Sequence, residues 1–478
     1  MNRSIIRYIL CKILEFAALF MVLPLLVGIL YREKAAASFA VVIAGCLAVS
    51  LLGRRLKPAS KVFYAKEGFV TVSLSWILLS LVGALPFYLS GEFPTFTDAL
   101  YETVSGLTTT GSTVLTDVEG LSRSIQFWRC FTHWIGGMGV LVLILAVLPL
   151  SGSYNMHLMR AESPGPSVGK LVPRVKNTAM ILYGIYIFIT FMEVIVLLFG
   201  GMDLYEALTL TFSTVGTGGF GLLNSSIGSY PMGIQAVFTV FMLLCGINFQ
   251  IYYLLLIRKP KDVLHSEELR YYLGIILLAS VLIAVNVRGV FADGFQAFHH
   301  ALFQVVSLMT TTGFATLDYD VWPEFSKAIL FLITLLGACA GSTGGGFKVS
   351  RLVILWRSVK NEISAAIHPR SIKKIHMEGR IVGEGTVRSV LVYTAIYTMI
   401  FLVSLLLLSL NEFDFVTNIS AVAANFNNVG PGFHMVGPAG NYAQFSGFSK
   451  FVLMFDMLAG RLELLPILVL FSVKTWRE

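Results

Sequence analysis

The sequence predicts an all-α polytopic membrane protein in which two N-terminal helices precede four similar repeats. The first observation behind this class is composition: the 478-residue chain is 56% hydrophobic and 13% charged, whereas about 25% of a soluble domain is charged. The second is the length of its apolar runs, since Phe69–Ser90 and Ser389–Leu410 each hold 22 residues without a charge, enough to cross a bilayer. The third is a short polar motif that recurs along the chain.

Ten apolar segments are long enough to be membrane spans. The first is too long, and has the wrong flanks, for a cleaved signal peptide, so we expect a retained helix. The expected spans are residues 13–30, 38–52, 69–90, 128–150, 178–200, 232–257, 271–287, 326–346, 389–410 and 446–472.

Charge placement predicts the orientation of these spans. Basic residues gather in Arg54–Lys66, Arg160–Lys176, Arg258–Lys261 and Lys348–Arg380, and at both termini. By the positive-inside rule these segments and both termini are cytoplasmic. Because this positive charge is spread over short loops between spans, it does not indicate nucleic-acid binding.

The opposite connections are acidic and should face outside. Acidic residues at an outer mouth would raise the local cation concentration, although ordinary solvated loops explain them equally well. These residues are Asp117, Glu119, Asp318, Asp320 and Glu324.

The five cysteines and eight histidines do not form a pattern typical of a metal or redox site. No CxxC pair is present, and the cysteines lie in or beside apolar runs, as small buried hydrophobic residues do. We also find no cluster of His, Asp, Glu or Ser near one face that would suit a membrane enzyme.

The polar motif is TTTGSTVL at residues 108–115 and TTTGFATL at residues 310–317. Asp98–Gly111 and His300–Gly313 align without gaps and are identical at eight of fourteen positions. Weaker copies, FSTVGTG and FNNVGPG, begin at Phe212 and Phe426. The reference glycines Gly111, Gly216, Gly313 and Gly430 are 105, 97 and 117 residues apart, which predicts a fourfold internal array.

Each copy lies between two spans and follows a short, moderately apolar segment. Such a segment covers roughly half a bilayer as a helix, and Thr97 and Asp98 are typical of the start of one. Non-helical backbone at membrane depth must be buried in protein or line a water-filled cavity. Four such loops therefore predict pseudo-fourfold repeats of helix, pore helix, filter loop and helix around one ion pore.

The loop chemistry favours a cation. Backbone carbonyls can replace the hydration shell of an ion, as in the TVGYG loops of potassium channels, and glycine adopts the required dihedrals at low cost. TVGTG at Thr214–Gly218 is one residue from that signature. A single such motif would more often mark helix packing, but four copies favour a filter. The candidate filter residues are Thr109, Thr110, Gly111, Thr214, Val215, Gly216, Thr311, Thr312, Gly313, Asn428, Val429 and Gly430.

On TTTGSTV, STVGTGGFG, TTTGFAT and NNVGPGF, with two extra N-terminal spans, the chain resembles the Trk/Ktr/HKT superfamily of potassium transporters, in particular the membrane subunits of bacterial Trk systems. The resemblance covers almost the whole length. It implies extra helices in residues 1–60 and pore repeats in 61–170, 171–265, 266–380 and 381–478. Some plant relatives with serine in the first loop favour sodium, whereas Gly111 matches the potassium-permeable pattern.

The same resemblance implies a potassium uptake channel or transporter subunit that conducts dehydrated K⁺. Rb⁺ should also permeate, and no cofactor is expected. The implied setting is the cytoplasmic (inner) membrane of a bacterium. The implied partners are a second copy, in a homodimer, and a cytoplasmic ring of nucleotide-binding regulatory subunits, with Lys348–Arg380 as one candidate docking face. Whether flux is passive or coupled to protons or sodium stays open.

Two features suggest a gate. Residues 337–348, GACAGSTGGGFK, hold enough glycine to break the span of the third repeat, and the resemblance implies an intramembrane loop below the filter with Gly341, Gly344, Gly345 and Gly346. Close helix packing is the alternative. An intramembrane arginine is a functional candidate by default, and the resemblance implies that Arg461 projects into the pore as an electrostatic barrier. Pairing with another span's carboxylate, such as Glu193, is its alternative.

Other functions fit less well. GTGGFG at Gly216–Gly221 lacks the strand and the acid that a dinucleotide-binding fingerprint needs. GSTGGGFK lacks the ending of a phosphate-binding loop. A carrier with inverted repeats would pair units of opposite topology, whereas all four units here face the same way. A scaffolding membrane subunit would not need four re-entrant loops.

Overall fold

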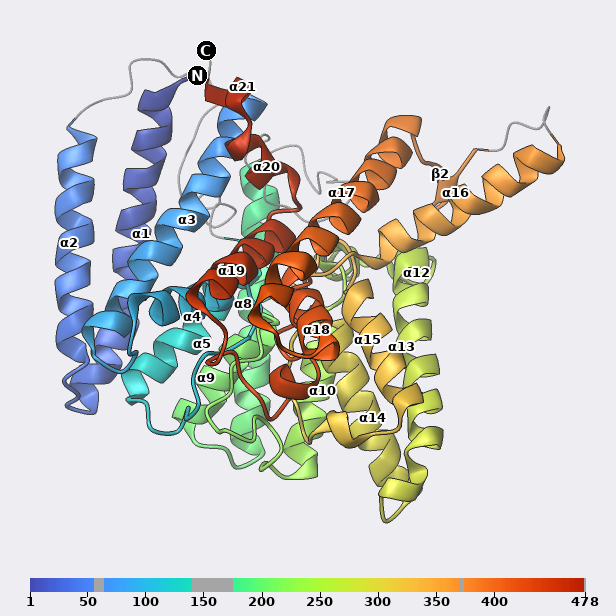
Figure 1. The fold of residues 1–478 in the computed structure, drawn as a ribbon, viewed down its shortest axis with the longest axis horizontal. Coiled ribbons are helices and arrows are strands. Elements are labelled where there is room, and N and C mark those ends of the chain that lie inside the picture. The colour runs from blue at the N-terminus through green and yellow to red at the C-terminus, as the bar shows by residue number, and fades with distance from the viewer. Residues whose placement is uncertain (56–63, 140–174, 369–373, 477–478) are drawn as a thin grey trace.

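The computed structural model describes residues 1–55, 64–139, 175–368 and 374–476, and most of these residues are helical. Figure 1 shows helices packed side by side, with both termini at the same end. Shorter helices and loops fill the centre between the long ones. Of the predicted basic clusters, residues 56–63 and 160–174 lie outside the described part, as do residues 140–150 of the fourth predicted span.

The long helices match the predicted spans. Six described helices are long and apolar enough to cross a membrane, and they comprise the N-terminal pair and the first helix of every repeat. The N-terminal pair is α1 (Arg3–Leu30) and α2 (Ala36–Arg54), and the first helices of the repeats are α3 (Ala65–Leu89), α8 (Val175–Phe199), α13 (Glu267–Asn286) and α17 (Glu384–Leu408).

The predicted half-helices are present in all four repeats. Each begins with an oxygen-bearing N-cap whose side chain accepts a main-chain N–H bond, the usual way to satisfy the first amides of a helix. In the first repeat this cap is Thr95, so the start predicted at Thr97 and Asp98 is two residues late. The pore helices and their caps are α4 (Phe96–Leu107, Thr95), α9 (Leu204–Val215, Asp203), α14 (Gly294–Met309, Asp293) and α18 (Phe415–Phe426, Asp414).

The second span is interrupted in the second, third and fourth repeats, and the described helix of the first repeat ends at Gly137. The sequence predicted an interruption only in the third. Glycine is the common feature, with Gly137, Gly246, Gly337 and Gly460 at or beside the ends of the outer segments. In the second repeat the two helical pieces meet at 87°. The outer pieces are α5 (Arg123–Gly137), α10 (Met232–Cys245), α15 (Glu324–Leu336) and α19 (Gly447–Arg461), and the described pieces that follow are α11 (Phe249–Leu256), α16 (Val349–Ile367) and α20 (Leu465–Phe471).

The remaining described helices and strands are short. They are the helices α12 (Pro260–Leu264) and α21 (Val473–Trp476), and the antiparallel hairpin of β1 (His376–Met377) and β2 (Arg380–Ile381). Single 3₁₀ turns complete the fold at Arg288–Val290, Tyr319–Val321, Ser409–Asn411 and His434–Val436.

Polar contacts close the four repeats into a ring. The last repeat meets the first through a buried ion pair, with Lys450 Nζ 2.7 Å from Asp98 Oδ1. Next to it, Tyr442 N donates to Thr113 O at 2.8 Å. Segments more than 300 residues apart in the sequence thus lie side by side around the centre.

A second buried ion pair joins the first pore helix to α5, and its carboxylate also accepts hydrogen bonds from the loop between them. Arg129 of α5 bonds Glu102 Oε1 of α4 at 2.8 Å, and both side chains are at most 1% exposed. Glu102 also accepts from Thr113 Oγ1 and from Val114 N at 3.1 Å. In the third repeat, Gln304 occupies the matching place and donates to Thr316 and Leu317. A charge is therefore not required for this loop contact.

Replacing Arg129 with Ala should destabilise the fold by roughly 3–5 kcal/mol, because Glu102 would stay buried without its cation. The double variant Arg129→Met/Glu102→Gln, which copies the amide of the third repeat, should recover most of that loss. Thermal unfolding in detergent measures both variants. Equal loss in the single and double variants would contradict the assignment of the cost to an unpaired charge.

Candidate functional site

Each pore helix ends in the same tight turn. In the first repeat, Thr109 has φ +56° and Gly111 has φ +81°. Thr311 and Gly313 repeat this pair of positive φ angles in the third repeat, and Asn428 and Gly430 in the fourth. The predicted filter residues of these three repeats therefore occupy equivalent positions.

The second repeat has the same turn three residues later than the sequence alignment placed it. Thr217 has φ +54° and Gly219 has φ +82°, whereas Gly216 is right-handed and caps α9. The structural counterpart of Gly111 is thus Gly219, not Gly216, and the predicted Thr214 and Val215 are the last two residues of the pore helix. The alignment followed the TVGTG string, but GTGGFG offers several glycines and the string does not reveal which one has a positive φ.

The residue two places before each glycine also has a positive φ, and in three repeats it is strained. Thr109, Thr217 and Thr311 are β-branched residues at φ +54° to +58°, a region that such residues rarely adopt. Strain of this kind costs of order 1–3 kcal/mol per residue and persists only where surrounding structure imposes it. The positive φ recurs in all four repeats, at Asn428 in the fourth, and indicates a shared geometric requirement.

The four glycines close into one ring. A Cβ on Gly111 would overlap the carbonyl oxygen of Gly218 in the second turn. The same relation continues around the centre, with each glycine against the residue before the next glycine. The remaining pairs are Gly219 with Thr312 O, Gly313 with Val429 O, and Gly430 with Thr110 O. The turns are therefore in mutual main-chain contact around a common axis.

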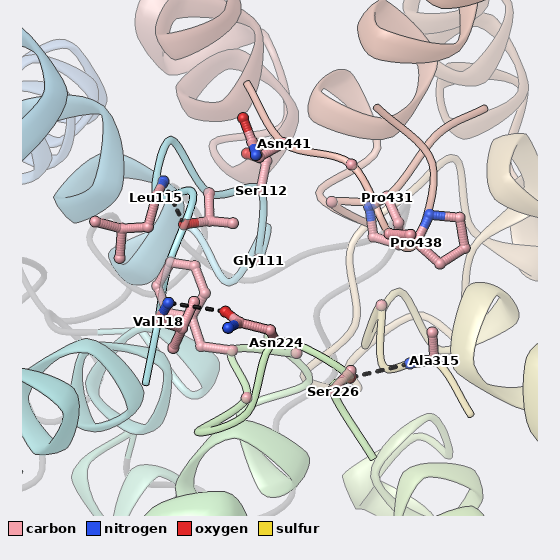
Figure 2. Close-up of a pocket in the computed structure, with 18 of the residues that line it drawn as sticks. Gly111, Ser112, Leu115, Val118, Asn224, Ser226, Ala315, Pro431, Pro438 and Asn441 are labelled. Carbon is pink, nitrogen blue, oxygen red and sulfur yellow. Dashed lines mark hydrogen bonds between the residues drawn. The ribbon is translucent and has the colours of Figure 1, made fainter. Parts of the chain in front are cut away.

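A cavity opens onto this ring. All four glycines, Gly111, Gly219, Gly313 and Gly430, line it together with the loops that follow them. Figure 2 shows these loops arranged around the cavity, with Ser112, Asn224, Ala315 and Pro431 contributed by successive repeats.

Hydrogen bonds between neighbouring loops hold the cavity walls. Val118 N donates to Asn224 Oδ1 at 2.9 Å, and Ala315 N donates to Ser226 Oγ at 3.2 Å (Figure 2). Asn224 also donates to Asp117 at the exposed rim, and this bond lowers the pKa of Asp117. The predicted acidic residue Asp117 is thus ionised and lies beside the cavity rather than in its lining.

The glycine-rich loop of residues 337–348 lies directly against the opposite side of the ring. Gly345 N donates to Thr311 Oγ1 at 2.6 Å. A Cβ on Gly344 would contact Thr310 O, and one on Gly345 would contact Asn427 O. The loop therefore packs against the third and fourth turns through its own main chain.

Arg461 connects this loop to a different repeat. Its guanidinium donates to Thr343 O of the loop at 2.9 Å, to Gly137 O of α5 at 2.8 Å, and to Gly136 O. Main-chain carbonyls thus take the place of the carboxylate partner considered at Glu193. Since Thr343 Oγ1 also donates to Cys245 O, this layer joins residues of all four repeats.

Two further contacts anchor the loop from the side of the termini. Glu268 of α13 accepts from Ala340 N at 2.7 Å and from Ser350 N at 3.2 Å. Lys348 Nζ donates to Gly344 O. Lys348 and its neighbour Arg351 are at most 4% exposed, so these two members of the predicted Lys348–Arg380 cytoplasmic cluster are buried.

Replacing Gly219 with Ala should destabilise the fold by at least about 1–3 kcal/mol, because a side chain at this φ is strained and would overlap Thr312 O. Gly233→Ala is the matched control, since no atom lies within 4 Å of a Cβ there and alanine favours helix. Thermal unfolding compares the two. A Gly219→Ala variant as stable as Gly233→Ala would contradict the tight ring.

Comparisons with known proteins agree with this architecture. A family model, TrkH, described as a cation transport protein, matches residues 36–292 and 291–477. The chain is 36% identical to the Trk system potassium uptake protein TrkH of Salmonella typhimurium, covering 100% of this chain and 99% of that one. It is 34% identical to TrkG of Escherichia coli, with 100% of both covered. The crystal structure of the potassium transporter TrkH from Vibrio parahaemolyticus matches with a TM-score of 0.90, at 31% identity and over 100% of both chains.

This likeness confirms the predicted fold class and the predicted resemblance. The relatives are named as transport proteins rather than enzymes. Because the family model and the relatives both cover nearly the full length, the chain belongs to the TrkH family of cation transport proteins.

Proposed function

We propose that this protein is the membrane subunit of a potassium uptake system and conducts K⁺ through the ring of four turns. The observation that carries the proposal is the contact of four glycine turns around one axis below an outer cavity. The names of the relatives agree, since the TrkH and TrkG proteins are called potassium uptake proteins.

The ring suits a dehydrated monovalent cation. Main-chain carbonyls replace water oxygens around an ion without adding a formal charge, and an isolated buried carboxylate would be costly. The residues that we assign to the filter end at the ring glycines: Thr109, Thr110, Gly111, Thr217, Gly218, Gly219, Thr311, Thr312, Gly313, Asn428, Val429 and Gly430. Because each repeat supplies one short turn, we expect Rb⁺ to pass and Na⁺ to be rejected less strictly than by a longer filter.

The loop and Arg461 form the gate in this proposal. An ion leaving the ring toward the termini meets Gly344 and Gly345, which pack against the third and fourth turns, and then the positive guanidinium of Arg461. This charge is held near the axis by carbonyls from two repeats. A cation therefore meets both a steric and an electrostatic barrier until these contacts are broken.

Regulation would reach this gate from the cytoplasmic side. We place both termini, α12 and the β1–β2 hairpin in the cytoplasm, following the basic segments. Glu378 of the hairpin accepts from Ser266 Oγ and from Glu268 N at the start of α13, and Glu268 holds the loop. A regulatory ring that moves the hairpin would thus pull on the gate. A homodimer in the inner membrane is the assembly we expect.

Uptake of radiolabelled rubidium by the purified protein in liposomes tests the function. We expect uptake driven by an inward gradient, strong competition by K⁺ and weak competition by Na⁺. Empty liposomes provide the control for leak. Equal competition by K⁺ and Na⁺ would contradict a potassium filter. No uptake by either the wild type or the Arg461→Ala variant described below, with both proteins folded, would contradict the proposed transport.

Replacing Arg461 with Ala should raise cation flux several-fold in the same liposomes, because the electrostatic barrier and the tie between Thr343 and α5 are both lost. Arg461→Lys keeps the charge without the fork of donors and should give an intermediate flux. Unchanged or lower flux in a well-folded Arg461→Ala variant would exclude the barrier role.

A further inference from the structure

His133 lies fully buried in α5, and both of its ring nitrogens are bonded to main-chain groups. Nδ1 lies 2.8 Å from Gly106 O, and Nε2 lies 3.2 Å from Phe220 N. Because the Phe220 amide can only donate, Nε2 accepts, and Nδ1 carries the proton and donates to Gly106 O. Both bonds are made at once only by the neutral ring in this tautomer.

The two groups that His133 joins belong to different repeats. Gly106 lies in the last turn of the first pore helix, α4, and Phe220 directly follows the ring glycine Gly219. A Cβ on Gly218 would overlap the imidazole, and the Phe220 ring packs on it with centroids 4.3 Å apart. The imidazole therefore supports the second turn from behind, at the same level as the ring.

The fourth repeat lacks a comparable side chain. Gly136 of α5 and Gly460 of α19 each pack against the carbonyl of the last residue of their own pore helix. His133 and Met457 each lie three residues before these glycines and so occupy matching positions in the two repeats. A thioether is at most a weak acceptor, so only the first of these two positions offers a strong hydrogen-bond acceptor to the next turn.

We propose that His133 is a positioning residue that sets ion selectivity by fixing the second turn of the ring. Through the Phe220 amide it holds the carbonyls of Gly218 and Gly219 at one distance from the axis. Without this acceptor the second turn can shift and the ring can adapt to a smaller ion. Discrimination between Rb⁺ and Na⁺ should then fall before conduction does. This inference rests on the proposed filter.

The test compares His133→Gln with His133→Met in the rubidium uptake assay. The two side chains have nearly the same size, but only glutamine carries an oxygen that can accept from Phe220 N. We expect His133→Met to lower the Na⁺ concentration that halves rubidium uptake by about ten-fold, the effect of one unpaired buried amide. His133→Gln should stay within about two-fold of the wild type. Total uptake and thermal unfolding report folding separately.

Three outcomes would overturn the inference. A folded His133→Met variant that discriminates like the wild type shows that the acceptor is not needed. An equal loss of discrimination in both variants shows that the shape of the imidazole, rather than its hydrogen-bond acceptor, matters. If His133→Met does not fold, His133→Asn, which can still donate to Gly106 O but is too short to reach Phe220 N, should lose discrimination; if it keeps it, the inference fails. A wild type that does not discriminate overturns the proposed filter itself.

Discussion

The arrangement depends on one constraint: main-chain groups at membrane depth need partners or a protected cavity. Four non-helical turns meet at the centre of this chain, and each glycine packs against a carbonyl of the next turn. None of the four can move without disturbing a neighbour. The capped pore helices and the buried pairs Arg129–Glu102 and Lys450–Asp98 hold this centre from outside. The backbone strain at Thr109, Thr217 and Thr311 persists only because the pore helices and the two ion pairs together hold these turns in place.

Much of this architecture could be predicted from the sequence, because the TTTG copies and the apolar runs are local patterns. The ring glycines Gly111, Gly313 and Gly430 followed directly from them. The second turn was misplaced by three residues, because the sign of a φ angle depends on contacts between turns, and a short sequence motif does not reveal those contacts. Lys348 was counted with the cytoplasmic charges for a similar reason, since a basic residue beside a predicted loop gives no sign that its stem and charge are buried.

His133 escaped sequence analysis altogether. A lone histidine on an apolar helix carries no motif, and its partners Gly106 and Phe220 are 27 residues before it and 87 after it. A residue behind only one turn is possible because all four repeats belong to one chain. Each repeat can therefore have a different side chain behind its turn. A ring of four identical subunits would have to place the same residue behind every turn, whereas here Glu102 and Gln304 also differ at matching positions.

The end of α5 at Gly137 and the position of Arg461 are related. A helix that ends inside the membrane leaves its last carbonyls without intrahelical partners, and an arginine at that depth is costly unless it is paired. Arg461 meets this need of α5 by bonding Gly136 O and Gly137 O. In the proposed gate, opening the path separates the guanidinium from these carbonyls, which then need other partners. Water that enters as the loop withdraws would supply them, so in this proposal the step that admits the ion also hydrates the end of α5.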